Sequence, residues 1–299
     1  MWGTAVAADP RDSTRAWDEA DLANPHAQPD KARRVEAMFA AIAESYDLNN
    51  RLHSFGRDQA WRRAAVRAAG LRGGEVVADV ACGTGDLAMA FADALQRLPP
   101  SRDNGRELAR QSPDQAEGDT SPTPATAGGP PTKTAPPRGG RVVGLDFTRS
   151  MLDLAERKRG GRPIEYRHAD AMDLPLDAAS VDVVSIAFGI RNVADPGRAL
   201  AEFHRVLKPG GRLVVLEFSE PRNPLLRWGN ALYCRRVMPW TATLIARDRS
   251  GAYRYLPKSV ATFLDRDALA EAMRQAGFAD VTTRPVTFGV AAIHRGLKP

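Results

Sequence analysis

Short apolar runs alternate with amphipathic stretches along most of the chain. Runs rich in valine, isoleucine, leucine and phenylalanine, typical of buried strands, occupy residues 76–80, 142–146, 164–167, 181–187 and 212–218. Between them, apolar residues recur every three or four positions and predict helices at 87–95, 150–159 and 197–207. The alternation predicts an α/β fold with a doubly wound, mostly parallel sheet whose ligands bind at the carboxyl ends of the strands.

Further patterns extend this series at both ends. Residues 33–71 read as helical throughout and precede the first strand. The Lys-Pro-Gly-Gly sequence at 208–211 is predicted to end a helix and turn into the last parallel strand. Near the C-terminus, a helix at 267–277 is followed by a hairpin of 280–288 and 290–294, which predicts a pair of antiparallel strands.

Two polar segments are expected to lie outside the packed core. Residues 1–30 are predicted to be a disordered tail. Residues 99–138 contain 9 prolines and one large apolar side chain, Leu108, so they cannot bury a core and should form a disordered or loose insertion. The roughly 230 residues that remain suit one domain, which we expect to run from 31 to 299 with the insertion inside it.

The first apolar run ends in a glycine-spaced turn, Val-Val-Ala-Asp-Val-Ala-Cys-Gly-Thr-Gly-Asp-Leu at 76–87. Gly83 and Gly85 have no Cβ to keep a ligand away from the backbone. A dinucleotide-binding turn would carry a third glycine, where this chain has alanine, and Asp79 and Asp86 would repel a pyrophosphate. The pattern favours a cationic ligand such as S-adenosylmethionine; the alternative is a turn that only joins a strand to a helix.

A second acidic residue, Asp146, ends the next apolar run. Gly85 and Asp146 are 61 positions apart, and leaving out the 40 residues of the insertion gives 61 − 40 = 21. That interval is close to the about 20 residues expected of a nucleotide-binding strand-helix-strand unit, whose second acidic residue accepts hydrogen bonds from the ribose hydroxyls. The insertion is therefore an excursion within one domain.

Composition and charge narrow the classes of protein that the chain could belong to. The net charge of +6 permits a nucleic acid or an anionic membrane as a neighbour, but no arginine-rich run or RNA-binding signature is present, so no nucleic-acid partner is expected. Cys82 and Cys234 form no metal-binding pattern, and we expect neither a metal nor a disulfide. With no apolar stretch long enough to span a membrane and no secretory leader pattern, the expected location is the cytoplasm.

Three further groups of residues make the pattern more specific. They are Ser-Tyr-Asp-Leu-Asn-Asn at 45–50 with Trp-Arg-Arg at 61–63, Phe-Gly-Ile-Arg-Asn at 188–192, and Leu-Glu-Phe-Ser at 216–219 with Tyr-Arg-Tyr-Leu-Pro-Lys-Ser at 253–259. With the glycine turn, they resemble the ubiquinone/menaquinone biosynthesis C-methyltransferases over residues 35–298, the insertion left out. This resemblance implies a class I methyltransferase fold, Rossmann-like, with a C-terminal antiparallel strand pair and an N-terminal helical lid.

The chain departs from that family at four positions. Asn49 stands where the family usually has methionine, Asp58 and Gln59 stand where it often has histidine and arginine, and Ala187 replaces a serine. The last change removes a hydroxyl just before the Phe-Gly-Ile-Arg-Asn sequence.

The resemblance implies methyl transfer from S-adenosyl-L-methionine to a ring carbon of a prenylated quinol. Demethylmenaquinol is the favoured acceptor, with naphthoquinol and benzoquinol both left open. The implied cofactor residues are Gly83, Thr84 and Gly85 at the methionine moiety, Asp79 at its ammonium, Asp146 at the ribose, and Asp170 and Ala171 at the adenine.

The implied catalytic residues are Arg191, Asn192 and Tyr46. Arg191 and Asn192 would stabilise a developing phenolate by charge-assisted hydrogen bonds, whereas the alternative for Arg191 is a surface ion pair with Asp195. Tyr46 would act from the helical lid as a proton relay or a contact to the ring. For Asp47, next to it, the alternative is a helix cap.

Partners and competing classes complete the expectations. Residues 225–245 combine large apolar side chains with arginines, and could cover a prenyl tail and touch the inner face of an anionic membrane, or form a helical lid on the core. A homodimer is left open. The alternatives are a non-catalytic methyltransferase-fold scaffold of a quinone-biosynthesis complex, a methyltransferase acting on another small aromatic substrate, and one acting on nucleic acid.

Overall fold

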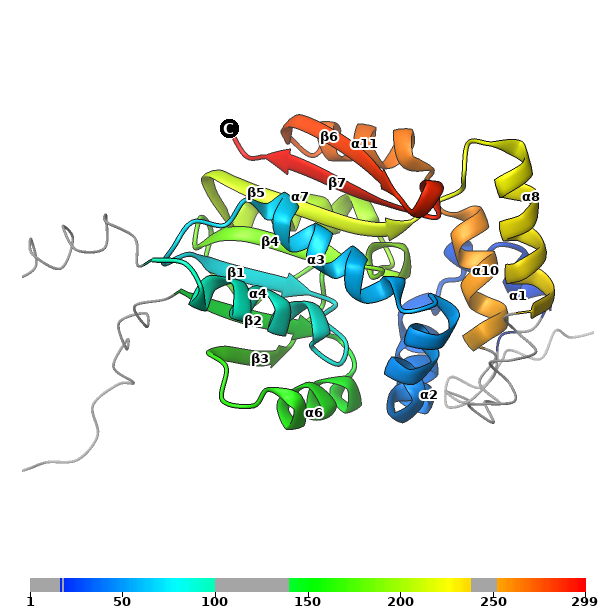
Figure 1. Cartoon of the computed structure of the whole chain (residues 1–299), viewed down its shortest axis with the longest axis horizontal. Helices are drawn as coiled ribbons and strands as arrows, with labels where there is room; N and C mark the ends of the chain where they lie inside the picture. The colour runs from blue at the N-terminus through cyan, green and yellow to red at the C-terminus, as the bar shows by residue number, and fades with distance from the viewer. Residues whose placement is uncertain (1–16, 18, 100–139, 238–251) are drawn as a thin grey trace, which may run out of the picture.

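The computed structural model describes residue 17 and residues 19–99, 140–237 and 252–299. At its centre is a seven-stranded sheet with the order β3-β2-β1-β4-β5-β7-β6 (Figure 1). The strands are β1 Val76–Val80, β2 Arg141–Asp146, β3 Ile164–His168, β4 Val181–Ala187, β5 Leu207–Phe218, β6 Ala279–Val286 and β7 Ala291–Leu297. Strands β1 to β5 pair in parallel, and β7 runs antiparallel to β5 and β6. The predicted mostly parallel sheet with a C-terminal antiparallel pair is confirmed.

The order of the strands fixes where a ligand can bind. β1 pairs with β2 on one side and with β4 on the other, so the chain reverses its direction of winding between β1 and β4. In open α/β sheets, a crevice forms at the carboxyl ends of the strands at such a point.

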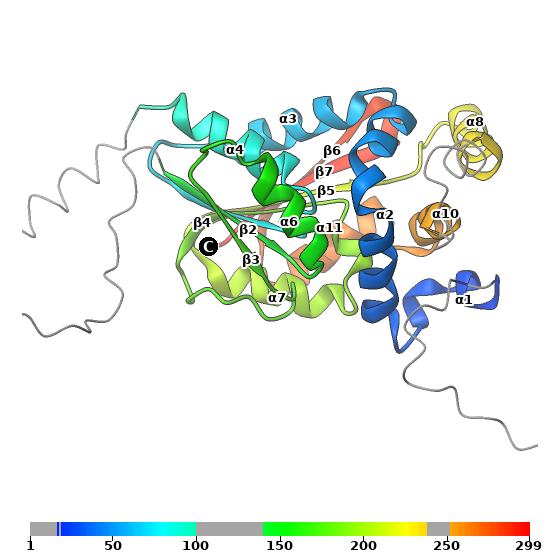
Figure 2. The ribbon, with the colours of Figure 1, turned by 90° about the horizontal axis from the view of Figure 1, so that it is seen from below.

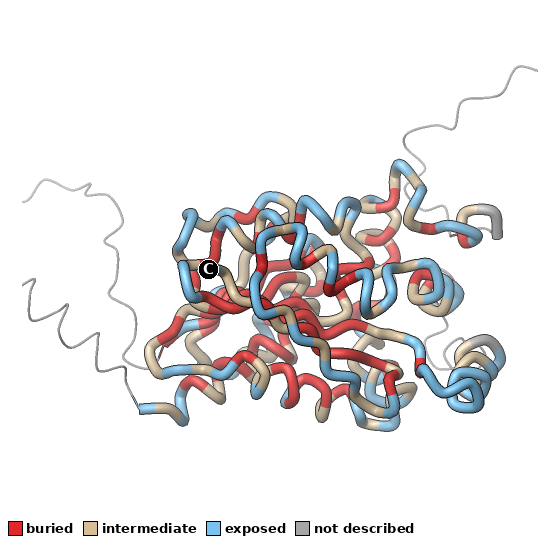
Figure 3. Tube along the Cα trace, turned by 90° about the horizontal axis from the view of Figure 1, so that it is seen from above, coloured by how far each residue is buried: buried red, intermediate tan, exposed pale blue. Residues whose placement is uncertain are grey.

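Helices cover both faces of the sheet (Figure 2). They are α3 Arg57–Ala69, α4 Asp86–Gln96, α6 Arg149–Lys158, α7 Pro196–Val206 and α11 Arg266–Gln275. Trp61 and Phe91, from α3 and α4, pack in one hydrophobic cluster with strand residues of one face, whereas Phe203 and Met273, from α7 and α11, pack in the cluster of the other face. Most residues of β1, β2, β4 and β5 are buried (Figure 3), which explains the apolar runs in these strands, whereas β3 and β6 at the edges of the sheet are largely half-buried or exposed.

A separate group of helices lies beyond the carboxyl ends of the parallel strands (Figures 1 and 2). It contains α1 Glu19–Ala23, α2 Lys31–His53, α8 Pro224–Leu232 and α10 Ala252–Thr262, with the short 3-10 turn Pro25–Ala27 between α1 and α2. Val35, Met38 and Ile42 of α2 pack with Tyr255 of α10 in a third apolar cluster. In α8 no residue is buried.

The structure differs from the sequence predictions at three places. The predicted helix over 33–71 is broken into α2 and α3, because the chain turns at Gly56, whose φ of 72° lies in the left-handed region. The Lys-Pro-Gly-Gly sequence at 208–211 is part of β5 and not a turn before it. There, Gly210 N donates to Lys298 O and Lys298 N donates to Gly211 O, at 2.8 and 2.9 Å, which extends the strand around a register shift.

The third difference concerns the expected N-terminal tail. Within it, Glu19–Ala23 form α1, because Trp17 and Leu22 are buried against α2 and α10, with the Trp17 and Tyr255 ring centroids 4.6 Å apart. The rest of the tail before residue 19 lies outside the described residues, as does the predicted insertion except for Pro99.

Candidate active site

The glycine turn, residues 81–85, joins β1 to α4. Gly83 and Gly85 have φ values of 55° and 83°, which glycine adopts without strain. A Cβ at Gly85 would overlap the hydroxyl of Tyr166. The turn therefore requires glycine, as the sequence suggested, although at Gly85 the close neighbour is a side chain of the protein.

Asp146 is held beside this turn at the end of β2. Its Oδ2 accepts a hydrogen bond from Gly83 N and its Oδ1 accepts one from Thr148 N, each at 2.8 Å. Burial raises the pKa of Asp146 above its usual value, although both amide donors oppose the rise. The carboxylate is fixed in position, and its remaining lone pairs can accept hydrogen bonds from a diol.

A cavity of about 110 Å³ opens at this point, and we call it the small cavity. It is lined by six of the predicted site residues, Tyr46, Gly83, Asp146, Asp170, Ala171 and Asn192, and by the apolar side chains Phe147, Met151 and Met172. The charged side chains that line it are Glu36, Asp146 and Asp170, and no lysine or arginine of the described chain does so. Its charge suits a cationic ligand and disfavours a pyrophosphate.

A second cavity of about 600 Å³, the large cavity, lies between the sheet and the helices α2, α3, α8 and α10. Phe39, Tyr46 and Phe188 line both cavities, so the two meet at these residues. Phe188 has a φ of 56°, a strained backbone conformation for a non-glycine residue and one found most often at functional sites.

Aromatic rings form one wall of the large cavity. The ring centroids of Trp61 and Phe188 are 5.9 Å apart, and those of Phe188 and Phe218 are 4.4 Å apart. Such a wall can pack against the face of an aromatic ligand.

Arg191 follows β4 in the 3-10 turn Ile190–Asn192 and lines the large cavity. It is 4% exposed, and its Nη1 donates to Glu217 Oε1 at 2.7 Å and to Phe188 O at 2.6 Å. The alternative of a surface ion pair with Asp195 is wrong, because the Asp195 carboxylate instead caps α7 by accepting from Arg198 N. Arg191 is thus part of a buried, neutral ion pair whose guanidinium borders a cavity.

The other two predicted catalytic residues lie close to Arg191. Asn192 Nδ2 donates to Phe188 O at 3.2 Å, and Asn192 Oδ1 accepts from the hydroxyl of Tyr255 at 3.0 Å. Burial raises the pKa of Tyr46, although Arg62 and Arg191 both act to lower it. Tyr46 lines both cavities, Asn192 lines the small cavity and Arg191 lines the large one.

Three predicted cofactor residues, Asp79, Thr84 and Gly85, line neither cavity. Asp79 is 1% exposed; its Oδ1 accepts from Ser185 Oγ at 2.5 Å, and its Oδ2 has no partner among the described residues. Burial raises the pKa of Asp79 to about 7. The carboxyl group therefore lies beneath the glycine turn, within the sheet.

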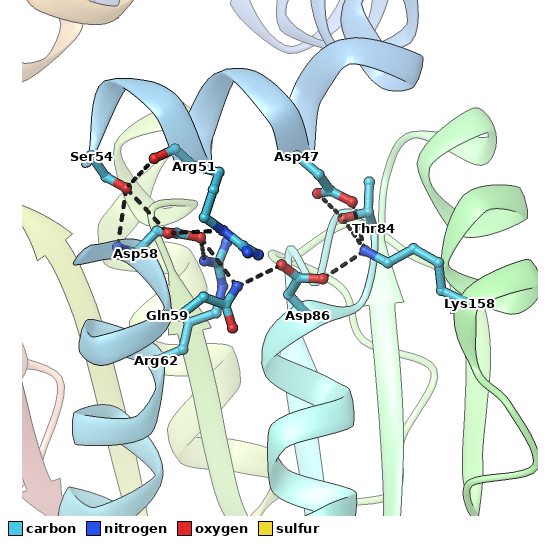
Figure 4. A network of polar contacts seen from close by, with 9 residues as sticks. All are labelled: Asp47, Arg51, Ser54, Asp58, Gln59, Arg62, Thr84, Asp86 and Lys158. Carbon is cyan, nitrogen blue, oxygen red and sulfur yellow. Dashed lines mark hydrogen bonds and ion pairs between the residues drawn. The ribbon is translucent and has the colours of Figure 1, made fainter. Parts of the chain in front are cut away.

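Thr84 belongs to a polar network that ties the turn to the helices above it (Figure 4). Its hydroxyl donates to Asp47 Oδ1 at 2.6 Å, and Lys158 Nζ contacts Asp47, Asp86 and Thr84 at 2.6, 2.6 and 3.1 Å. Gln59 extends the network from Asp86 towards α3. Asp47 therefore joins α2 to the turn, and it is not a helix cap, because α2 continues to His53.

Several residues that shape the site were not predicted. Glu217 lies in the Leu-Glu-Phe-Ser sequence, which helped to identify the family but gave this residue no role. Lys31 donates to Val193 O at 2.6 Å and fixes α2 to the loop after Asn192, and burial lowers its pKa to about 8. Arg62 is 7% exposed and lines the large cavity. The signal for Arg62 was the Trp-Arg-Arg sequence, which identified the family but gave no role.

Two features of the described residues concern metal binding and membrane spanning. No group of three or more histidine, cysteine, aspartate or glutamate side chains there is arranged to hold a metal ion, and Cys82 and Cys234 are both free thiols. None of the helices in the described part of the chain is long and apolar enough to cross a membrane.

Comparison with known families and proteins gives consistent results. A model of the ubiE/COQ5 methyltransferase family matches residues 27–298. The demethylmenaquinone methyltransferase of Thermus thermophilus is 41% identical over 264 residues, which cover 88% of this chain and 100% of the relative. A ubiquinone/menaquinone biosynthesis C-methyltransferase of a Geobacter species is 38% identical over 278 residues, covering 91% and 100%.

Solved structures resemble the fold at lower identity. A SAM-dependent methyltransferase from Thermotoga maritima aligns with a TM-score of 0.52 at 20% identity, over 89% of this chain and 100% of that one. A second from Aquifex aeolicus also has a TM-score of 0.52, at 14% identity, over 85% and 98%. The architecture is therefore that of the class I methyltransferases.

Proposed function

The chain belongs to the ubiE/COQ5 methyltransferase family and is a methyltransferase, and we propose that it methylates a ring carbon of a prenylated quinol with S-adenosyl-L-methionine as the donor. The observation that carries the proposal is the junction of the two cavities. An acidic cavity beside the glycine turn meets a larger, aromatic-walled cavity at Tyr46 and Phe188. One cavity suits a cationic donor and the other an aromatic acceptor. Demethylmenaquinol is the favoured acceptor.

The charge and the polar groups of the small cavity suit the donor. S-adenosyl-L-methionine supplies a methyl group on a positively charged sulfur. Asp146 would accept hydrogen bonds from the ribose, while Asp170 and the Ala171 amide would face the adenine between Phe147 and Met172. Gly83 exposes a peptide group on the methionine side. Asp79 and Thr84 would act from behind the turn, through the position of the glycine backbone.

The large cavity would hold the quinol and prepare it for attack. A ring carbon becomes a good nucleophile when a neighbouring hydroxyl loses its proton, so the site must stabilise a phenolate. Arg191 Nη2 donates to none of the described residues and can donate to that oxygen. Glu217 keeps the resting site neutral, and Asn192 orients the Phe188 carbonyl that holds Arg191. The surrounding aromatic side chains exclude water, which strengthens these contacts.

A prenyl tail requires an apolar path from the cavity to a membrane. On α8, Leu225, Trp228 and Leu232 are 73%, 66% and 47% exposed, and the exposed Arg227 also lines the large cavity. Apolar side chains beside a cation suit the surface of an anionic membrane. We therefore also propose that the protein works in the cytoplasm and touches the inner face of the membrane through α8.

The membrane contact can be tested on α8 alone. Replacing Leu225 and Trp228 with serine should reduce co-sedimentation with anionic vesicles at low salt, because about 50 Å² or more of apolar surface per side chain no longer enters the interface. Activity towards an acceptor with a short, water-soluble tail should stay unchanged. Equal vesicle binding by the wild type and the double variant would remove α8 from the proposal.

The activity itself is tested with a labelled methyl donor and a panel of demethylated quinols. We expect transfer to prenylated naphthoquinol, and the panel also includes a benzoquinol. The Arg191→Gln variant should lose about 100-fold or more in kcat while binding the donor normally, since it lacks a transition-state contact. The matched control is Arg198→Gln, an exposed arginine of α7. Transfer to no quinol, with the donor bound, would contradict the proposed function.

A further inference from the structure

The large cavity contains a second buried cation besides Arg191. Its charged lining residues in the described chain are Arg57, Asp58, Arg62, Arg191, Glu220 and Arg227. Of these, Asp58, Arg62 and Arg191 are buried, at 4%, 7% and 4% exposed. Arg62 is therefore shielded from solvent and still borders the space that an acceptor would enter.

Arg62 has hydrogen-bond donors to spare. Its Nη1 donates to Asp58 Oδ2 at 2.7 Å, and its Nε and Nη2 donate to none of the described residues. Asp58 is also held by other groups, because it accepts from Ser54 Oγ and from Gln59 Nε2, each at 3.1 Å (Figure 4). The carboxylate thus neutralises Arg62 without occupying the whole guanidinium.

The Arg62–Asp58 pair resembles the Arg191–Glu217 pair, except that Arg51 Nε also lies 3.4 Å from Asp58 Oδ1. Each is a buried ion pair with a single hydrogen bond from Nη1 to its carboxylate, at 2.7 Å in both. The guanidinium groups reach the cavity from different elements, α3 and the turn after β4. The cavity therefore offers two separate donors and carries no net charge from the two pairs.

Aromatic side chains line the same cavity as the two arginines. Trp61, next to Arg62 in α3, packs on Phe188, and Phe188 packs on Phe218. Arg191 lies over the ring of Phe218, with its guanidinium carbon 5.2 Å from the centroid. Both guanidinium groups also act on the Tyr46 hydroxyl, since each opposes the rise in pKa that burial causes there. Both pairs thus surround the junction of the cavities.

We propose that Arg62 is a specificity-determining residue that binds one ring oxygen of the acceptor while Arg191 binds the other. This inference rests on the proposed function. A quinol carries two oxygens on opposite sides of its ring, so one guanidinium is available for each. A ring with a single hydroxyl would leave the buried Arg62 guanidinium without an oxygen to contact. A site built to hydrogen-bond an oxygen discriminates strongly against an analogue that lacks this oxygen.

The simpler alternative is that Arg62 only stabilises α3, as half of an ion pair with Asp58 four residues before it. The two accounts differ in what happens when the substrate loses an oxygen. A structural role affects all acceptors equally. A contact to the oxygen matters only when that oxygen is present.

The experiment combines a change in the protein with a change in the acceptor. Two acceptors with the same prenyl tail are compared, a quinol and an analogue that keeps only the hydroxyl next to the reacting carbon. Wild-type enzyme should prefer the quinol by about 10- to 100-fold in kcat/KM, the size of one hydrogen bond to a charged group. Arg62→Gln should lose that preference through slower reaction of the quinol alone. Arg63→Gln, a change at the exposed neighbour, should keep it.

A second variant guards against misfolding. Arg62→Gln leaves the buried Asp58 with only the longer ion pair to Arg51, at 3.4 Å. Asp58→Asn with Arg62→Gln is therefore made as a neutral replacement of the whole pair, and donor binding by calorimetry reports on the fold. Equal loss for both acceptors, or no loss in either variant, would overturn the role of Arg62. If the wild type methylates neither acceptor although it binds the donor, the proposed function itself fails.

Discussion

The buried carboxylates around the glycine turn show how single residues set the properties of the site. Asp146 receives two backbone N–H donors, at 2.8 Å each, which stabilise its charged form. Asp79 receives one side-chain hydroxyl, from Ser185, and burial raises its pKa to about 7. The ionisation of Asp79 should therefore affect stability near neutral pH.

Replacing Asp79 with asparagine should change how stability depends on pH. The pKa of this carboxyl is near 3.8 when unfolded and about 7 when folded, so the folded protein binds more protons between these values. Its free energy of unfolding should fall as pH rises towards 7, by at most about 1.4 kcal/mol per pH unit from this group. The Asp79→Asn variant has no carboxyl group at this position, so its free energy of unfolding should not fall in this way. Urea denaturation at pH 5 and pH 8 should show the variant gaining on the wild type at the higher pH, and parallel pH profiles would contradict the assignment.

The role proposed for Arg191 also depends on one neighbour. Glu217 is 2% exposed and its Oε2 has no partner among the described residues, so the pair with Arg191 is neutral but incompletely satisfied. A ring oxygen of the bound quinol would give the Arg191 guanidinium a second anionic contact as negative charge develops on the quinol ring. The sequence could predict a role for Arg191 from its motif, whereas the Leu-Glu-Phe-Ser sequence around Glu217 indicated the family without showing that Glu217 pairs with Arg191.

At the level of helices and strands, the apolar pattern of the sequence predicted well those bounds that depend on nearby residues. β1 and β4 have the predicted bounds because their apolar runs end at a turn. Helices α4, α6 and α7 differ from the predicted bounds by one residue at either end, and α11 ends two residues earlier than predicted. The break between α2 and α3 was missed, since the apolar pattern continues across Gly56. The extension of β5 through 208–211 was missed because it depends on hydrogen bonds to Lys298, 87 or more residues away.

The contacts of the helical lid could not be predicted either, and Lys158 is the one that can be tested most simply. It links α6 to Asp47 of α2 and to Asp86 at the start of α4 (Figure 4). Its side chain is 31% exposed, so its contribution to global stability should be about 1 kcal/mol or less. Its effect should instead be local, on how firmly α2 is held over the glycine turn.

Hydrogen exchange measures this local effect. In Lys158→Met, amides near Asp47 in α2 should exchange faster, and the affinity for the donor should fall, while the melting temperature changes little. Lys208→Met is the matched control, because Lys208 also forms a surface ion pair, with Asp182 at 2.8 Å, at a site away from both cavities. Equal protection of α2 in the two variants would show that Lys158 does not hold the lid.

For the whole molecule, the arrangement of the strands places the site and the two ends of the undescribed segment at opposite edges of the sheet. Pro99 and Gly140, the residues that border the undescribed part of the insertion, lie near the amino ends of β1 and β2, and both cavities lie beyond the carboxyl ends (Figure 1). From the interval between Gly85 and Asp146 with the insertion left out, the sequence predicted only that the insertion is an excursion within one domain. A short connection from α4 to β2 should therefore serve the fold equally well.

Replacing residues 100–139 with a short glycine-serine linker tests whether the fold and the activity need the insertion. We expect kcat/KM within about twofold of the wild type, since the site is untouched. Thermal stability should be equal or slightly higher, because closing a shorter loop costs less entropy. A large loss of activity in a folded variant would show that the insertion reaches the site.

The most direct measurement is the position of a labelled methyl group after a single turnover. Enzyme, isotopically labelled S-adenosyl-L-methionine and a demethylated prenyl naphthoquinol are mixed, and the product is analysed by NMR. The account predicts one label on the ring carbon next to a hydroxyl, formed by the wild type and almost absent with Arg191→Gln. A label on oxygen, or an equal yield from the variant, would contradict a cavity in which a guanidinium activates a ring carbon towards the methyl donor.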